Sequence, residues 1–321
     1  MQRMFVLAFS IAAAAAGGAM AQPLYPDKPI HLLVGFPPGS QADTVARLFG
    51  QKLAEAVGRP VVIDTASGAA GSIAADRLAK AAPDGYTLGL MGEVQMVINP
   101  SLYKLAYDPL KDLAPISQVT WSPNMLVVNN AVAARSVEEL VRLAKSHPGA
   151  LTFASGGSGS SPHMAAELFN ASAGTDIRHI AYKGVVLGLP DLISGRVTMM
   201  FSPIGIVLPL VREGKLRALA VTSSKRSPAA PGVPTIAESG YAGFEYTAWY
   251  GLVAPAGTPA AVMRKLQLET AKVLALPDLH AKLADAGVEG VGNSSDEFTA
   301  MIKSEIPKWA KVIKDADIKP D

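Results

Sequence analysis

The chain has 321 residues, which is enough for two domains of ordinary size. Lysine and arginine total 29 against 27 aspartates and glutamates, so the net charge is only +2, and no basic block marks a nucleic-acid partner. Cysteine is absent and the five histidines are scattered without paired spacing, which excludes disulfides and argues against a metal site. A composition of 49% hydrophobic and 17% charged residues is typical of a well-buried α/β protein.

The N-terminus has the pattern of a secretory signal peptide. Arg3 precedes an apolar run over residues 4–16, and a small-x-small cleavage site ends at Ala21. No later stretch reaches about 18 uninterrupted apolar residues, the length of a membrane-spanning helix. We therefore expect residues 1–21 to be a cleaved signal peptide, the mature chain to begin near Gln22, and the protein to work outside the cytoplasm. An N-terminal membrane anchor is the alternative.

Strands and helices alternate in the first third of the mature chain. The apolar run 30–36 predicts a buried parallel strand, which the prolines at 37 and 38 end. The next segment places Val45, Phe49 and Leu53 on one helical face and stops before Gly58. A strand at 61–64, a glycine turn at 68–72, a helix at 73–82 and a strand at 86–91 follow. This βαβαβ order predicts an open, mostly parallel sheet.

The same alternation restarts later in the chain. Ser136 and Glu139 form a capping-box pattern for a helix that ends near His147, and Ser161-Pro162 is typical of a helix start. Strands are expected at 126–128, 151–154, 177–181, 197–201 and 216–222, and helices at 164–173, 189–194, 204–213, 260–275, 279–286 and behind the Ser294/Glu297 capping box. Two such lobes without a long linker suggest two domains that face a cleft.

The extended stretches at 114–128 and 246–254 are candidate connections between the lobes. In that arrangement the chain crosses twice and its C-terminal helices return to the first lobe. We therefore assign residues 22–124 and 250–321 to domain 1 and residues 125–249 to domain 2.

Glycine- and serine-rich loops follow several predicted strands, where ligands bind in open α/β sheets. These loops cover residues 37–43, 67–72, 155–163 and 182–186, and each precedes a helix. Backbone N–H groups at a helix N-terminus attract anions, and the helix dipole adds roughly half a positive charge. One carboxylate held by the first and third loops needs no cationic side chain. The alternative is that these are ordinary tight turns.

Enzymatic signatures are incomplete. No serine in the third loop satisfies G-x-S-x-G, because Ser158 is followed by Ser160 at the second glycine position. His163 lies in the first turn of a helix, and Asp43 fits a helix cap better than a general base. No phosphate-loop motif occurs, and G-x-G-x-x-G is missing from the first loop. We therefore expect a binding protein with no catalytic residues, no metal and no cofactor.

Several short motifs together resemble one family over essentially the whole mature chain. They include Tyr25-Pro-Asp-Lys-Pro, Val34-Gly-Phe-Pro-Pro-Gly, Ala82-Pro-Asp-Gly-Tyr-Thr-Leu, Ile98-Asn-Pro-Ser-Leu-Tyr, Gly157-Ser-Gly-Ser-Ser-Pro-His, Tyr182-Lys-Gly and Trp249-Tyr-Gly-Leu. In combination they look like the Bug/TctC family, the extracytoplasmic solute receptors of tripartite tricarboxylate transporters.

The resemblance implies a two-lobed periplasmic binding protein of the α/β class. Each lobe is expected to be an open, mostly parallel sheet flanked by helices, with two crossover strands between them. Such a monomer would close on a small carboxylated solute and dock on integral membrane permease subunits. The expected ligand-binding residues are Pro38, Gly39, Ser40, Gln41, Ala42, Asp43, Ser155, Gly157, Ser158, Gly159, Ser160, His163, Lys183, Gly184, Val185 and Ser202.

The chain departs from the family pattern at several of these positions. Ser40 stands where a second glycine is usual, Val185 and Val186 replace a smaller sequence, and Ser202 stands where an acidic residue is common. The loss of an acid and the gain of apolar bulk favour an apolar or aromatic carboxylate over an amino acid. Two other functions stay open at this point: a secreted serine hydrolase, and a sensor that presents its solute to a signalling receptor.

Overall fold

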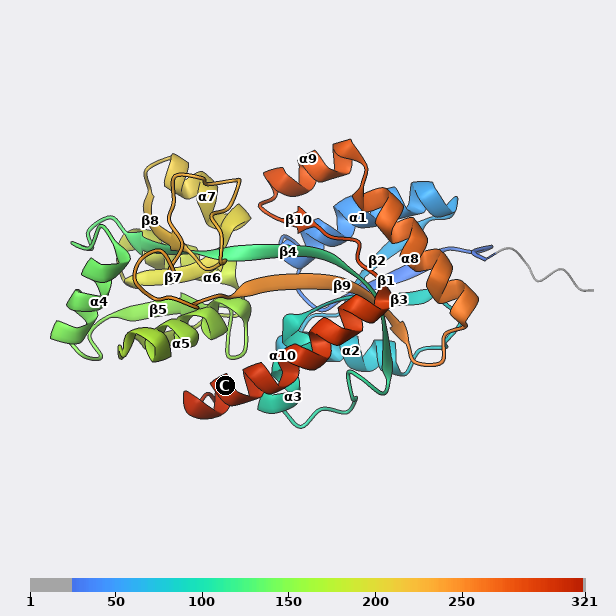
Figure 1. Cartoon of the computed structure of the whole chain (residues 1–321), viewed down its shortest axis with the longest axis horizontal. Coiled ribbons are helices and arrows are strands. Elements are labelled where there is room, and N and C mark those ends of the chain that lie inside the picture. Colours follow the sequence, from blue (N-terminus) through green and yellow to red (C-terminus); the bar gives the residue numbers. More distant parts are fainter. Residues whose placement is uncertain (1–24, 320–321) are drawn as a thin grey trace, which may run out of the picture.

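The computed structural model describes residues 25–319, so the predicted signal peptide lies outside the described residues. The chain forms two lobes at opposite ends of the molecule, and long strands run between them (Figure 1). Within the described residues the strands form one continuous path in the order β2-β1-β3-β9-β4-β7-β5-β6, with β8 and β10 paired to β4. None of the helices in residues 25–319 is long and apolar enough to cross a bilayer.

The first lobe begins with the predicted βαβαβ unit. Strands β1 (Ile30–Val34), β2 (Val61–Thr65) and β3 (Thr87–Gly92) pair in parallel, and helices α1 (Gln41–Val57) and α2 (Ser72–Ala79) connect them, the latter after a short turn, η1 (Ala69–Gly71). Helix α1 ends as expected at Gly58, whose φ of 70° is the left-handed conformation that favours glycine. This part of the prediction is confirmed.

Two short helices after β3 were not predicted. They are η2 (Val94–Ile98) and α3 (Asn99–Leu102), and the residues of η2 are all buried. The run is short, and its polar residue Gln95 is buried with the apolar ones, so its periodicity could not separate a helix from a strand.

The second lobe repeats the alternation. Strands β5 (Thr152–Ser155), β6 (Arg178–Ala181) and β7 (Met199–Pro203) pair in parallel, and β8 (Leu216–Val221) joins the sheet through β4. The helices of this lobe are α4 (Val137–Ser146), α5 (Ser161–Ala173), α6 (Val185–Ser194) and α7 (Ile204–Arg212).

Two helix starts in this lobe differ from the prediction. Helix α5 is capped by Ser160, one residue earlier than expected, and α6 begins at Val185 rather than near Leu189. The capping box of α4 forms only in part, because the Glu139 carboxylate accepts the N–H of Arg135 at 2.7 Å instead of that of Ser136.

The strands between the lobes match the predicted extended stretches. Strand β4 (Leu113–Asn129) pairs antiparallel with β9 (Thr247–Pro255) as far as Pro123, and from Asn124 onward it pairs with β7 and β8. The chain therefore changes lobe inside one continuous strand. The division into domains at 124/125 and 249/250 stays a prediction.

The C-terminal helices return to the first lobe. Helices α8 (Ala260–Leu274) and α9 (Pro277–Asp285) pack against α1, and β10 (Glu289–Gly290) pairs with β4. Helix α10 (Ser295–Asp315) has the predicted capping box, with both the Ser294 and the Glu297 bonds present. It lies against η2, α3 and β4 and runs obliquely from the first lobe toward the second (Figure 1).

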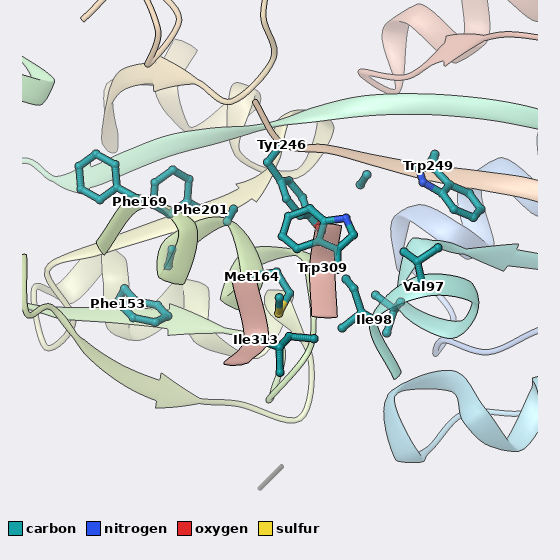
Figure 2. Close-up of a cluster of buried hydrophobic side chains, with 14 of the residues drawn as sticks. Val97, Ile98, Phe153, Met164, Phe169, Phe201, Tyr246, Trp249, Trp309 and Ile313 are labelled. Carbon is teal, nitrogen blue, oxygen red and sulfur yellow. The ribbon is translucent and has the colours of Figure 1, made fainter. Parts of the chain in front are cut away.

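The largest core cluster continues across both lobes beneath α10. Figure 2 shows Trp309 of α10 beside Tyr246, with ring centroids 5.1 Å apart, and Met164 and Phe201 of the second lobe in the same cluster. Trp249 of β9 packs edge-on against Phe298 at 5.2 Å. Such aromatic pairs add about 0.5–1.5 kcal/mol beyond the burial of their surface. The junction between the lobes is therefore apolar and well packed.

Candidate functional site

A cavity of about 420 Å³ lies between the two lobes. The loop after β1, the start of η2 and Tyr250 of β9 form its first-lobe side, and the segments that precede or begin α5, α6 and α7 form the other. The residues that line it are Phe36, Pro37, Pro38, Gly39, Ser40, Gln41, Gly92, Glu93, Val94, Gly156, Ser160, Ser161, Pro162, Lys183, Gly184, Val185, Val186, Leu187, Pro203, Ile206 and Tyr250.

Helix N-termini from both lobes converge on this cavity. Within residues 25–319, four helices have their capping residue in its wall: Ser40 for α1, Ser160 for α5, Gly184 for α6 and Pro203 for α7. The first N–H groups of a helix have no partner within the helix, and the aligned peptide dipoles place partial positive charge there. The cavity is thus built to attract an anion without a cluster of cationic side chains.

The first loop is held in shape by its own polar groups. The Ser40 hydroxyl accepts the N–H of Asp43 at 3.2 Å, and the Asp43 carboxylate accepts the N–H of Gly39 at 3.0 Å. Burial acts against the charge of Asp43, yet the guanidinium of Arg47 and the Gly39 amide hold its pKa below the usual range. Gly39 has a φ of 79°, which favours glycine at this turn.

The structure places the predicted residues of this loop in two groups. Pro38, Gly39, Ser40 and Gln41 line the cavity. The other two predicted residues lie behind the wall, since Ala42 is buried and Asp43 supports the turn, with the capping role taken by Ser40.

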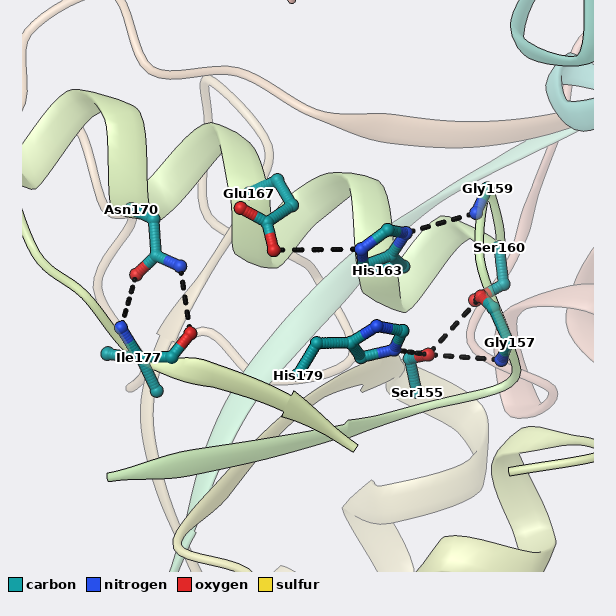
Figure 3. Close-up of polar contacts among 9 residues, drawn as sticks. All are labelled: Ser155, Gly157, Gly159, Ser160, His163, Glu167, Asn170, Ile177 and His179. Carbon is teal, nitrogen blue, oxygen red and sulfur yellow. Dashed lines mark hydrogen bonds and ion pairs between the residues drawn. The ribbon is translucent and has the colours of Figure 1, made fainter. Parts of the chain in front are cut away.

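Most polar side chains of the third loop, residues 155–163, form contacts that hold the loop in shape (Figure 3). The buried Ser155 hydroxyl contacts the His179 ring nitrogen at 2.5 Å and accepts the N–H of Gly157 at 3.0 Å. His163 accepts the N–H of Gly159 at 3.0 Å through Nδ1, and its ring stacks on that of His179 with centroids 4.0 Å apart. These contacts fix the loop so that its neighbouring residues face the cavity.

Five predicted residues of this loop therefore do not line the cavity: Ser155, Gly157, Ser158, Gly159 and His163. Ser160 does line it, together with Gly156, Ser161 and Pro162, which the sequence analysis had not selected.

The fourth loop, residues 182–186, also borders the cavity. Lys183, Gly184 and Val185 line the cavity, and the exposed Val186 and Leu187 extend its apolar wall. The buried Ser202 does not line it, whereas its neighbour Pro203 does, because successive residues of a strand point to opposite faces.

A buried acid on the first-lobe side was missed. Glu93 directly follows β3, lines the cavity and is 3% exposed. Its carboxylate accepts the N–H of Trp249 at 3.0 Å and the hydroxyl of Tyr246 at 3.2 Å. Burial raises the pKa of Glu93 to about 7. The available signal was a single charged residue inside the mostly apolar run 88–98, which contains no glycine- and serine-rich loop.

Gln41 provides an oriented hydrogen-bond donor. Its side-chain oxygen accepts the hydroxyl of Ser122 at 3.0 Å, which leaves the amide nitrogen directed elsewhere. That nitrogen is buried and has no hydrogen-bond partner within residues 25–319. Because buried polar groups rarely stay unpaired, this amide nitrogen is a candidate donor to a ligand oxygen.

No group of three or more histidine, aspartate or glutamate side chains in residues 25–319 is placed to hold a metal ion. Within the same range, the cavity wall carries one basic side chain, Lys183, and one acidic side chain, Glu93, amid mostly apolar groups.

Two α/β lobes, strands that pass between them and a cavity at their junction define the architecture of a periplasmic solute-binding protein. Residues 45–318 match the family model described as "Tripartite tricarboxylate transporter family receptor". The chain belongs to this family.

Two relatives are similar in sequence to this chain over most of its length. Protein BugT of Bordetella pertussis is 35% identical over 316 residues, which cover 98% of this chain and 97% of the relative. A UPF0065 protein from Pseudomonas sp. (strain P51) is 36% identical over 291 residues, or 90% and 86% of the two chains.

Solved structures agree as well. "R. palustris Rpa4515 with adipate" has a TM-score of 0.87 and 35% identity, with 92% of this chain and all of that chain covered. "MatC (Rpa3494) from Rhodopseudomonas palustris with bound malate" has a TM-score of 0.82 and 32% identity over 90% of this chain and all of that chain. The predicted fold class and family resemblance are confirmed.

Members of this family are binding proteins rather than enzymes, so the hydrolase alternative is wrong. The geometry agrees, because Ser155 is buried and Ser158 lies outside the cavity wall.

Proposed function

We propose that this protein captures a small carboxylate between its lobes in the periplasm and delivers it to the permease of a tripartite tricarboxylate transporter. The observation that carries the proposal is the convergence of helix N-termini from both lobes on one cavity. The family to which the chain belongs supports the transporter as the destination.

The carboxylate is proposed to lie between the start of α1 and the start of α5. Ser40 and Gln41 face it from the first lobe, and Ser160 and Ser161 from the second. Because one anion contacts both lobes, it stabilises the closed arrangement by its greater affinity for that state. Both halves of the site come from one chain, so a monomer is sufficient.

The remainder of the cavity favours an apolar ligand body. Val185, Leu187, Ile206 and Tyr250 offer aliphatic and aromatic surface. A relative of similar fold was solved with adipate, a dicarboxylate with an alkyl chain. We therefore place alkyl and aromatic carboxylates ahead of amino acids.

Thermal unfolding with a panel of carboxylates tests the proposal. A ligand at about 100 times its dissociation constant is expected to stabilise the fold by about 2.7 kcal/mol. The amide of the same acid, which lacks the charge, is the matched control and should give a much smaller shift. No shift with any carboxylate at millimolar concentration would contradict capture, and unchanged uptake after deletion of the gene would contradict delivery.

A further inference from the structure

An acidic side chain stands in the wall of the cavity for which we propose an anionic ligand. Glu93 lines the cavity from the first lobe. The N-terminus of α1 faces the cavity from the same lobe, and those of α5, α6 and α7 face it from the second lobe. The helix N-termini attract a carboxylate, and Glu93 repels a second one when it is ionised. The two features together make the cavity electrically asymmetric.

The position of Glu93 is fixed by its partners. One carboxylate oxygen accepts the Trp249 N–H at 3.0 Å, and the other accepts the Tyr246 hydroxyl at 3.2 Å. Neither bond is a salt bridge, so the charge of Glu93 is not neutralised where it lies. The group therefore keeps its charge available to act on a ligand.

The other titratable and charged groups around it do not cancel that charge. Tyr246 is buried and Tyr250 is partly buried, and both stay neutral because burial raises both pKa values above the ordinary range. Glu305 of α10 is a second acid, and its charge further raises the pKa of Glu93. Lys183 lines the same cavity, but it is exposed, and solvent and salt screen its charge.

We infer that Glu93 selects the charge of the ligand: the cavity takes a monocarboxylate readily, and takes a dicarboxylate only together with a proton on Glu93. The inference rests on the proposed function. When two carboxylates share a site, their repulsion favours a proton on one of them. A ligand carboxylate beside an ionised Glu93 creates this situation. A protonated Glu93 loses the repulsion and gains a donor for the second carboxylate of the ligand.

Burial brings the pKa of Glu93 to about 7, so the proton is available near neutral pH. Below that pH the acid is already neutral, and a dicarboxylate binds without a penalty. Above it, each binding event takes up one proton, and the affinity falls as pH rises. A monocarboxylate with an apolar far end brings no second charge toward Glu93, so its affinity depends less on pH.

Matched ligand pairs test this inference by calorimetry on the mature protein. Hexanoate and adipate share a six-carbon chain, and benzoate and terephthalate share a ring, so each pair differs by one carboxylate. Between about pH 6 and about pH 8.5, where the ligand carboxyl groups are mostly ionised, the dissociation constant of the dicarboxylate is expected to rise about 30-fold relative to its partner.

Two variants separate the charge of Glu93 from its structural role. Glu93→Gln keeps the shape and the partners, and it should remove the extra pH dependence of the dicarboxylate while leaving the monocarboxylate curve in place. Glu305→Gln is the matched control: this partly buried acid accepts the Trp249 indole N–H at 2.8 Å but does not line the cavity. It should keep the extra pH dependence of the dicarboxylate, with the midpoint at a lower pH because the charge of Glu305 no longer raises the pKa of Glu93.

The inference is overturned if the dissociation constants of both members of a binding pair change in parallel with pH. It is also overturned if Glu93→Gln keeps the wild-type pH dependence for the dicarboxylate. Either result leaves carboxylate capture intact. If no carboxylate of a panel that includes these four ligands binds at millimolar concentration, the proposed function fails and the inference falls with it.

Discussion

At the scale of single residues, we propose that the amide of Gln41 donates a hydrogen bond to the ligand carboxylate. Its oxygen is held by Ser122, and its nitrogen is buried without a partner in residues 25–319. A hydrogen bond to a charged group contributes about 1.5–3 kcal/mol, so Gln41→Leu is expected to weaken carboxylate binding by roughly 10- to 100-fold. Isothermal titration calorimetry with the strongest carboxylate of the panel measures the change.

The matched control for Gln41→Leu lies on the same helix. Gln51 is exposed, so Gln51→Leu makes the same chemical change away from the cavity and should leave the affinity as it is. Equal affinities of the Gln41→Leu and Gln51→Leu variants for the carboxylate would show that Gln41 does not bind the ligand.

The sequence located the binding loops better than the binding side chains. Glycine and serine after a strand predict where a helix begins, and the loops that hold Ser40 and Ser160 were predicted in this way, although the caps themselves were expected at Asp43 and Ser161. The same pattern does not say which side chains turn inward to hold the loop, as Ser155 and His163 do. Glu93 comes from a buried run without a loop motif, so only the three-dimensional packing reveals it.

At the scale of elements, β9 joins η2 to α10 through two acids, the buried Glu93 and the partly buried Glu305. Trp249 of β9 donates its backbone N–H to Glu93, which precedes η2, and its indole N–H to Glu305 of α10. Burial raises the pKa of both carboxyl groups. Both acids thus bind protons more tightly in the folded chain than in the unfolded one, and this junction weakens when they ionise.

The pH dependence of stability follows from the pKa of Glu93, which rises from 4.5 to about 7 on folding. The stabilisation by the neutral carboxyl is fully present below pH 4.5 and is lost as pH rises to about 7. Because glutamine resembles the neutral acid, Glu93→Gln should raise the unfolding free energy by about 1–3 kcal/mol at pH 8 and have little effect at pH 4.5. Urea unfolding at both values measures the difference. A gain of the same size at both would contradict the raised pKa.

Most elements were predictable because their signals are local. Caps, glycine stops and apolar runs sufficed for α1, α10 and the parallel strands. The start of α6 was misplaced because Val185 to Leu187 is apolar throughout and carries no capping side chain, so nothing in the sequence marks the first turn.

At the scale of the whole molecule, the lobes also touch beside α7, in addition to the strands between them and the apolar junction beneath α10. Gly205 near the start of α7 lies against the turn after α9, where a Cβ atom would come 2.0 Å from the carbonyl oxygen of Ala286. Helix α7 belongs to the second lobe and also carries Ile206 in the cavity wall. The absence of a side chain at Gly205 therefore sets how closely the two lobes approach beside the site.

The variant Gly205→Ala tests this contact. The added methyl group must displace α7 from the turn, and such overpacking costs about 1–3 kcal/mol. Because the cavity wall moves with α7, we expect weaker carboxylate binding and a larger radius of gyration in small-angle scattering with ligand present.

Gly214→Ala is the control: this residue has a φ of 70° and nothing within 4 Å of an added Cβ, so the substitution strains the backbone without touching the other lobe. It should lower stability by about 1 kcal/mol and keep the affinity. Wild-type affinity in Gly205→Ala would show that the contact between α7 and the turn after α9 does not set the spacing of the lobes.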